Sequence, residues 1–179
     1  MISGGFSFSQ MFTVSSLMIA INAGISEEIM FRAITGAVML RSRMDRKTIW
    51  PTVIATSILF GVVHLANILG GANIPRTFEQ VVFAVSFGIL CGAIYVSTGS
   101  IWPSMLLHFL HDFLVLGAAS RTAGVITVDT ITIESVLSTT ILFVILVGLS
   151  IFLLRKSRRE EIINLWKEKW HMDIPETEE

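Results

Sequence analysis

Charged residues are scarce in this chain, and the few that occur are clustered. Only 15% of the 179 residues are Asp, Glu, Lys or Arg, whereas 53% are hydrophobic. A soluble domain has about 25% charged and roughly 45–50% apolar residues. The shortage of charge therefore excludes an ordinary soluble domain and predicts an integral membrane protein. We expect membrane lipid, and no nucleic acid, as a partner.

Three further absences narrow the possibilities. The single cysteine, Cys91, excludes an intramolecular disulfide. The N-terminus lacks a basic segment followed by a small-residue cleavage site, so the first apolar stretch is interpreted as a retained helix and not as a signal peptide. No H-E-x-x-H motif is present, so the chain lacks the standard signature of zinc proteases.

Long apolar stretches dominate the rest of the chain. A helix spans a bilayer with about 20 apolar residues. Five stretches qualify, and the first of them is long enough to include a tilt or interfacial turns: 8–40, 50–69, 78–98, 101–119 and 135–154. We therefore predict an all-α, polytopic transmembrane helix bundle over residues 1–155, followed by a charged tail over 156–179.

Two basic segments orient this bundle. Arg41–Lys47 follows the first predicted span and Arg155–Arg159 follows the fifth. Basic loops favour the cytoplasmic side, and five spans place both segments on one side. We expect a cytoplasmic C-terminus, an external N-terminus, the cytoplasmic membrane of a prokaryote, and a cavity open towards the cytoplasmic leaflet.

The tail and one internal span carry patterned side chains. Ile162, Trp166 and Trp170 recur every four residues, which is typical of an amphipathic helix lying on the membrane surface. A solvated tail is the alternative. In the third predicted span, small residues at positions 84, 88 and 92 indicate close contact with a neighbouring helix of the same chain. Homo- or hetero-oligomerisation is left open.

Ionisable residues lie inside three of the predicted spans. They are Glu27, Glu28 and Arg32 in the first, His64 in the second, and His108, His111 and Asp112 in the fourth. Each charge costs a few kcal/mol or more in hydrocarbon, so such groups usually face a protein interior and are functional. A helix rises about 1.5 Å per residue, which places these groups at similar depths.

Their chemistry suits activation of a water molecule for hydrolysis. Glu27 is the candidate base, His64 would hold the same water, and His108 with Asp112 would line the opposite wall. An ionised Asp112 cannot donate a hydrogen bond, so it is either protonated or orients His108. Zinc bound by Glu27, His64 and His108 is the alternative, with an open position for water.

Other interpretations apply to each residue taken singly. Glu28 and Arg32 are four residues apart and form a pair that could be purely structural. His64 alone could be a satisfied interior histidine. The convergence of all these groups at one depth favours a functional site.

Three short motifs resemble those of the CPBP family, which contains CAAX proteases and bacteriocin-processing enzymes and is also named Abi. Glu27-Glu28-Ile-Met-Phe-Arg32 resembles its E-E-x-x-x-R motif, and Phe60-Gly-Val-Val-His64 resembles F-x-x-x-H. His108-Phe-Leu-His-Asp112 resembles the third motif, H-x-x-x-N or H-x-x-x-D. The ordered set covers about residues 20–118.

The resemblance implies an intramembrane endopeptidase acting on a peptide or lipidated protein, such as a prenylated CAAX protein or a leader peptide. It implies that Glu27 and His64 activate water, that His108 and Asp112 form the oxyanion site, and that Glu28 and Arg32 support the geometry. Both a metalloprotease and a metal-free, glutamate-dependent mechanism are attributed to the family, and we favour the metal-free one.

Two departures from the family pattern stand out. Asp112 occupies the position where the CAAX-processing branch has Asn. Few residues precede the first motif, whereas family members commonly carry additional N-terminal helices. The sequence therefore represents either a truncated chain or a minimal member, and a minimal member would need a partner to complete its bundle.

Two other classes of function are compatible with the same residues. A non-catalytic membrane protein could bind a peptide in this cavity, as a bacteriocin-immunity protein would. A proton-coupled transporter could use buried Glu, His and Asp as a relay, although the chain shows no inverted repeat and no paired broken helices.

Overall fold

The structure, a computed structural model, describes residues 13–122 and 131–172. Every regular element in these ranges is a helix, which confirms the predicted all-α class. Residues 8–12 of the first predicted span and residues 173–179 of the predicted tail lie outside the described residues.

The first long helix consists of three consecutive segments. These are α2 (Val14–Glu28), the π-helix η1 (Ile29–Gly36) and α3 (Ala37–Ser42). Thr13 caps its start, because the Thr13 side chain accepts a hydrogen bond from the Ser16 amide at 3.0 Å. The π-helix was not predicted from the sequence. It follows Glu28 directly and contains Arg32, so it belongs to the candidate site.

Four further helices complete the bundle. They are α4 (Ile49–Val63) with its short continuation α5 (Ala66–Leu69), α6 (Ile74–Thr98), α7 (Trp102–Thr122) and α8 (Ile133–Leu153). Asn73 caps the start of α6. Gly99 ends α6 with φ 65°, a left-handed conformation that glycine adopts without a Cβ clash.

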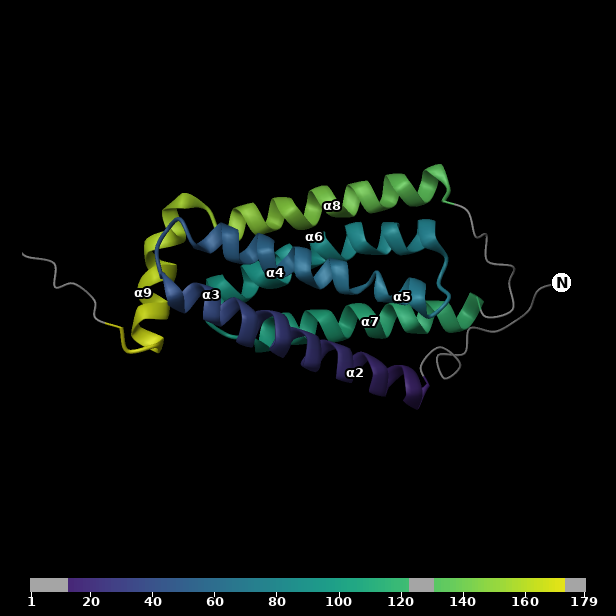
Figure 1. The fold of residues 1–179 in the computed structure, drawn as a ribbon, viewed down its shortest axis with the longest axis horizontal. Coiled ribbons are helices and arrows are strands. Elements are labelled where there is room, and N and C mark those ends of the chain that lie inside the picture. The colour runs from purple at the N-terminus through teal and green to yellow at the C-terminus, as the bar shows by residue number, and fades with distance from the viewer. Residues whose placement is uncertain (1–12, 123–130, 173–179) are drawn as a thin grey trace, which may run out of the picture.

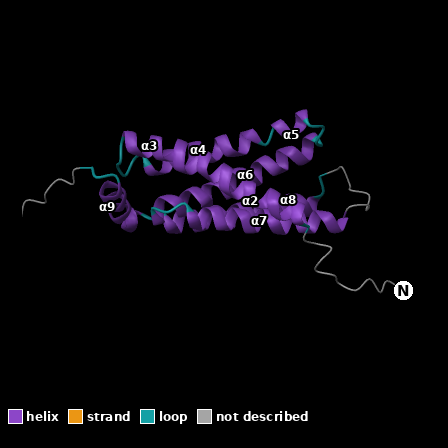
Figure 2. Cartoon of the chain, turned by 90° about the horizontal axis from the view of Figure 1, so that it is seen from below, coloured by secondary structure: helices purple, strands orange, loops and turns teal. Residues whose placement is uncertain are grey.

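The long helices lie side by side, and successive ones run in opposite directions (Figure 1). Helix α6 contacts α4, α7 and α8, while α2 packs against α7. Figure 2 shows α4 along one side of the bundle, α7 and α8 along the other, and α6 between them. Of the segments that carry the motifs, α4, α7 and the η1 part of the first helix contact α6.

Four helices are long and apolar enough to cross a membrane: Val14–Ser42, Ile49–Leu69, Ile74–Thr98 and Ile133–Leu153. Five spans were predicted. Among the described residues, α7 is not one of these four helices. His108, His111 and Asp112 lower the mean hydropathy of α7. It has 21 residues nonetheless and lies parallel to the others (Figure 1).

Close approach of helices depends on glycine at two contacts. A Cβ on Gly88 would lie 3.1 Å from the Ser57 Cβ, which confirms the predicted contact of the small-residue stripe with a neighbouring helix. A Cβ on Gly24 would lie 2.9 Å from the backbone nitrogen of Phe109. These contacts hold α6 against α4, and α2 against α7.

The tail forms a helix whose apolar face packs on the protein. Helix α9 (Arg159–Lys169) lies across the end of the bundle (Figure 1), and Trp166 is only 1% exposed. The Trp166 indole donates a hydrogen bond to the Val96 carbonyl at 2.8 Å. The predicted amphipathic helix is present. The expectation that its apolar face lies on the membrane surface was wrong, because Ile162 and Trp166 are buried in the bundle.

The larger part of the hydrophobic core lies at this same end. Leu40, Ile49, Val53 and Val96 pack there with residues of α9, forming the main core cluster. A second, smaller cluster surrounds Phe60 and Phe87 in the middle of the bundle, beside the motif residues. One half of the bundle is thus filled by core side chains, and the candidate site lies at its boundary.

Candidate active site

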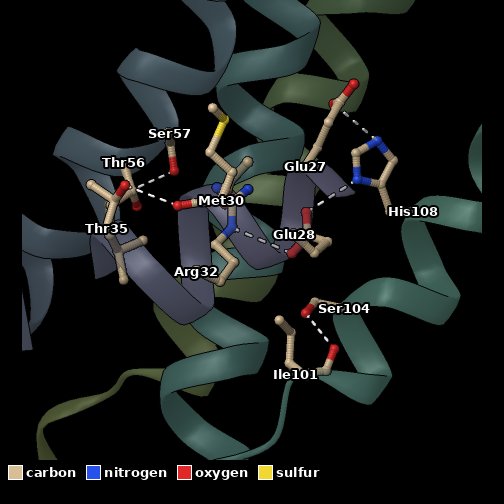
Figure 3. Close-up of polar contacts among 12 residues, drawn as sticks. Glu27, Glu28, Met30, Arg32, Thr35, Thr56, Ser57, Ile101, Ser104 and His108 are labelled. Atoms are coloured by element: carbon tan, nitrogen blue, oxygen red, sulfur yellow. Dashed lines mark hydrogen bonds and ion pairs between the residues drawn. The ribbon is translucent and has the colours of Figure 1, made fainter. Parts of the chain in front are cut away.

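Glu28 is buried and holds two partners from different segments. It is 0% exposed. Its Oε1 lies 3.1 Å from Nδ1 of His108 on α7, and its Oε2 lies 3.5 Å from Nε of Arg32 in the π-helix (Figure 3). The predicted pairing of Glu28 with Arg32 is confirmed. Because an ionised carboxylate only accepts hydrogen bonds, His108 donates from Nδ1.

Arg32 is fixed by contacts to two other helices. Its Nη2 donates to the carbonyl of Gly88 on α6 at 3.2 Å, and its guanidinium lies 5.3 Å from the ring centre of Phe60 on α4. Arg32 therefore joins the first motif to α4 and α6. Its Nε and Nη1 have no hydrogen-bond partner among the residues that the structure describes.

Glu27 approaches the other ring nitrogen of His108. Its Oε2 lies 3.8 Å from His108 Nε2, and Asp112 Oδ2 lies 3.6 Å from the same nitrogen. Glu27 and Glu28 both point towards His108 from one helix (Figure 3). The rotation of about 100° per residue on a helix separates their carboxylates, so that each faces a different side of the imidazole.

His64 ends α4 with its ring oriented by the backbone. Its Nδ1 lies 2.9 Å from the carbonyl oxygen of Phe60. A carbonyl only accepts, so Nδ1 carries the proton and Nε2 of the neutral ring is an acceptor. The Phe60 ring contacts both His64 and His108 edge-on, with ring centres 5.0 and 5.5 Å apart. Phe60 thus fixes the second and third motifs relative to each other.

His111 lines the same cavity, although no role was predicted for it from the motifs. Its Nδ1 lies 3.0 Å from Asp112 Oδ1, and its ring centre is 4.9 Å from that of Phe83 and 4.8 Å from that of Phe87. Its position one helical turn after His108 was the available signal, since residues three apart share a helix face.

One cavity of about 520 Å³ connects the reactive groups. Glu27, His64, His108, His111 and Asp112 all line it, together with aromatic residues of α4 and α6. Glu28 and Arg32 do not line it. The predicted site residues therefore fall into a set facing the cavity and a pair buried behind His108.

The cavity extends to the end of the bundle where α6 begins, because Arg76, Glu79 and Gln80 also line it. The basic segments lie at the other end, beside α9 (Figure 1). The cavity thus lies at the end of the bundle away from the basic segments, and the leaflet towards which it opens stays a prediction. No pattern in the sequence predicts that α9 and the main core cluster fill the half of the bundle beside the basic segments.

The metal-ligand set considered from the sequence does not form a recognisable site. In residues 13–122 and 131–172, no group of three or more His, Cys, Asp or Glu side chains is arranged to hold a metal ion. Glu27, His64 and His108 therefore do not fit the zinc site described above. The hydrogen bonds of His108 to Glu28 and of His64 to a backbone carbonyl both use Nδ1, so they orient the rings without excluding Nε2 as a ligand.

Comparison with known families identifies one family. The family model described as type II CAAX prenyl endopeptidase Rce1-like matches residues 9–114. This range covers more than half of the chain and includes every site residue named above. The chain belongs to the Rce1-like family.

Membership in the Rce1-like family confirms the resemblance carried by the three motifs and identifies, in general terms, a CAAX-type intramembrane endopeptidase. It also implies a lipid environment and a peptide substrate, in agreement with the four apolar helices. No curated protein and no solved structure matches the chain significantly.

Proposed function

We propose that this Rce1-like protein hydrolyses a peptide bond of a membrane-associated substrate with a water molecule activated by Glu27 and His64, without a catalytic metal. The proposal depends on one observation above all. Glu27, His64, His108 and Asp112 come from three separate helices and line a single cavity.

The first step uses the two acceptors that face the cavity. The Glu27 carboxylate accepts a proton from water, and His64 Nε2 accepts a hydrogen bond from the same molecule and orients it. The water oxygen then forms a bond with the carbonyl carbon of the substrate. General-base catalysis of this kind contributes about 10²–10⁴-fold to a rate.

The second step stabilises the oxyanion and releases the amine. His108, as an imidazolium, donates from Nδ1 to Glu28 and from Nε2 to the developing oxyanion. The C–N bond then breaks, and Glu27 passes its proton to the leaving nitrogen. Asp112, when ionised, cannot donate, so it orients His108 and His111 through the contacts at 3.6 and 3.0 Å.

The cavity also bears on the type of substrate. Its volume of about 520 Å³ falls within the roughly 300–1,000 Å³ of small-ligand pockets. Phe60, Phe83 and Phe87 give it apolar walls. A short extended peptide with apolar side chains fits this lining, and both a lipidated CAAX protein and a leader-type peptide provide one.

A cleavage screen tests the proposal. Purified protein in proteoliposomes is incubated with lipidated and unlipidated peptides, and products are identified by mass spectrometry. Glu27→Gln should reduce cleavage at least about 100-fold. Glu134→Gln, the same chemical change at an exposed position of α8, is the matched control and should leave cleavage unchanged. Cleavage that persists in Glu27→Gln would contradict the mechanism and favour a different base.

A further inference from the structure

A second cavity, of about 400 Å³, lies at the end of the bundle that carries the basic segments. One of its walls is the connection between α3 and α4, residues 43–47. The other wall is a face of α9, where Glu160, Ile163 and Lys167 recur every three or four residues. None of the three motifs contributes to this cavity, and the mechanism proposed above does not use it.

Both walls are held in place by ordered contacts. Met44 and Ile163 are 7% and 6% exposed and belong to the main core cluster. Asp45 Oδ1 accepts hydrogen bonds from the backbone amides of Lys47 and Thr48 at 2.8 and 2.9 Å. The connection that carries Lys47 is therefore anchored at two points, and the cavity is formed by the fold itself.

The charges around this cavity do not cancel. Each acid that lines it is paired with one of the arginines: Asp45 with Arg43 at 2.7 Å, and Glu160 with Arg46. Two lysines, Lys47 and Lys167, also line it. In residues 13–122 and 131–172, no ion pair involves either lysine. Two positive charges are therefore left for a ligand, and lysine commonly binds phosphate as a point charge.

The cavity lies at the level of the lipid headgroups. The apolar helices Val14–Ser42 and Ile49–Leu69 end and begin on either side of the connection. Deeper on the same two helices, Val38 is 67% exposed and Ile54 is 42% exposed. At 1.5 Å per residue these side chains lie about 6–8 Å into the membrane from the helix ends. Acyl chains cover such a surface, so a lipid fits both regions and a free anion fits only the first.

We propose that this cavity binds the headgroup of an anionic phospholipid. Lys47 and Lys167 contact the phosphate from the two walls, and the acyl chains lie along the exposed apolar residues of α3 and α4. Basic pockets between membrane helices bind anionic headgroups in this way. The bound lipid joins the α3–α4 connection to α9 and stabilises this end of the bundle.

Native mass spectrometry of the full chain in neutral detergent tests the site. The protein is titrated with phosphatidylglycerol, which is anionic, and with phosphatidylcholine, which is zwitterionic. A lysine near an anionic headgroup contributes about fivefold in affinity, so phosphatidylglycerol should bind at least about fivefold more tightly. Inorganic phosphate at the same concentration should not displace it. Equal binding of the two lipids, or displacement by phosphate, would overturn the proposal.

Three lysine variants distinguish a defined site from general attraction to a basic surface. Lys47→Gln and Lys167→Gln should each weaken phosphatidylglycerol binding about fivefold. Lys156→Gln is the matched control, because Lys156 is exposed in the short helix η2 (Lys156–Arg158) at the same end and does not line the cavity. An equal loss in all three variants would reject the site.

Thermal unfolding gives a second measurement. A ligand that binds only the folded state raises the unfolding midpoint, so phosphatidylglycerol should stabilise the wild type and have little effect on Lys47→Gln/Lys167→Gln. The same stabilisation in this double variant would contradict the proposal. Both measurements need no substrate and should give the same result in the Glu27→Gln background, so lipid binding and the proposed hydrolysis can fail separately.

Discussion

Glu27 and Glu28 are adjacent in the sequence, yet their carboxylates contact opposite nitrogens of the same imidazole. Glu28 is 0% exposed and lies 3.1 Å from His108 Nδ1, with Arg32 as its second partner. Glu27 is 38% exposed, faces the cavity, and lies 3.8 Å from His108 Nε2. Glu28 therefore stabilises the fold, whereas the chemically identical side chain of Glu27 is available for chemistry.

Replacing each glutamate with glutamine should separate these two roles. Glu28→Gln leaves the buried Arg32 without its counter-charge, and breaking a buried pair in this way costs about 3–5 kcal/mol. Glu27→Gln changes a group at the cavity surface and should leave the unfolding midpoint almost unchanged. Thermal unfolding of the two variants in detergent measures the difference.

A second substitution checks the cause of the Glu28 effect. In Glu28→Gln/Arg32→Met both buried charges are gone, and methionine can fill the space of the Arg32 stem. The double variant should be more stable than Glu28→Gln alone. An equal or greater loss in the double variant would contradict the assignment of the cost to an unpaired Arg32.

Gly24 controls how closely the first motif approaches His108. In Gly24→Ala the new Cβ would lie 2.9 Å from the Phe109 backbone nitrogen, so α2 must move away from α7. A misplacement of 1 Å can cost about 100-fold in rate, and we expect cleavage to fall at least tenfold. Gly148→Ala is the matched control, because no atom lies within 4 Å of its added Cβ. Equal activity of the two variants would exclude a role for this close contact.

Much of the bundle follows from local sequence patterns. Apolar length predicted the helices, Asn73 and Gly99 mark the ends of α6 by their capping geometry, and four-residue spacing predicted the Glu28–Arg32 pair. The contact between His108 and Glu28 joins residues 80 positions apart. From the sequence we expected only that the helices carrying these two residues would meet at a similar depth in the membrane.

The missed features depend on tertiary contacts. The π-helix places Arg32 near both Gly88 and Phe60. No pattern in residues 29–36 predicts a π-helix. The α9 pattern of Ile162 and Trp166 fits a lipid surface and a protein surface equally well. Only the folded bundle shows that Val96 accepts the Trp166 hydrogen bond.

Trp166 should therefore stabilise the bundle itself. Trp166→Ala removes a buried indole and its hydrogen bond to Val96, and such truncations cost about 3–5 kcal/mol. Trp102→Ala, at a tryptophan that is 73% exposed, should have little effect on unfolding in detergent. If α9 instead lay on lipid, Trp166→Ala would weaken membrane association and leave the unfolding midpoint in detergent unchanged.

Removal of metal should not affect cleavage. In residues 13–122 and 131–172 no three His, Cys, Asp or Glu side chains are arranged to hold a metal ion, and the proposed mechanism needs only acids and imidazoles. Enzyme treated with a chelator and shown to be metal-free by elemental analysis should keep its full rate. A loss of activity that zinc restores would reject the metal-free mechanism.

Asp112 offers the sharpest test of the oxyanion side of the site. An ionised Asp112 accepts a hydrogen bond from the His111 ring and lies 3.6 Å from His108 Nε2, but it donates nothing. Asparagine, the residue of the CAAX-processing branch, keeps an acceptor oxygen and adds an amide donor. Asp112→Asn should therefore retain kcat/KM for the peptide cleaved in the screen or increase it. Asp112→Leu, of similar size but without polar atoms, should lose at least about tenfold, because it removes the group that orients His108, whose oxyanion contact is worth about 10²–10³-fold. Equal loss in both variants would show that the negative charge of Asp112 is itself required.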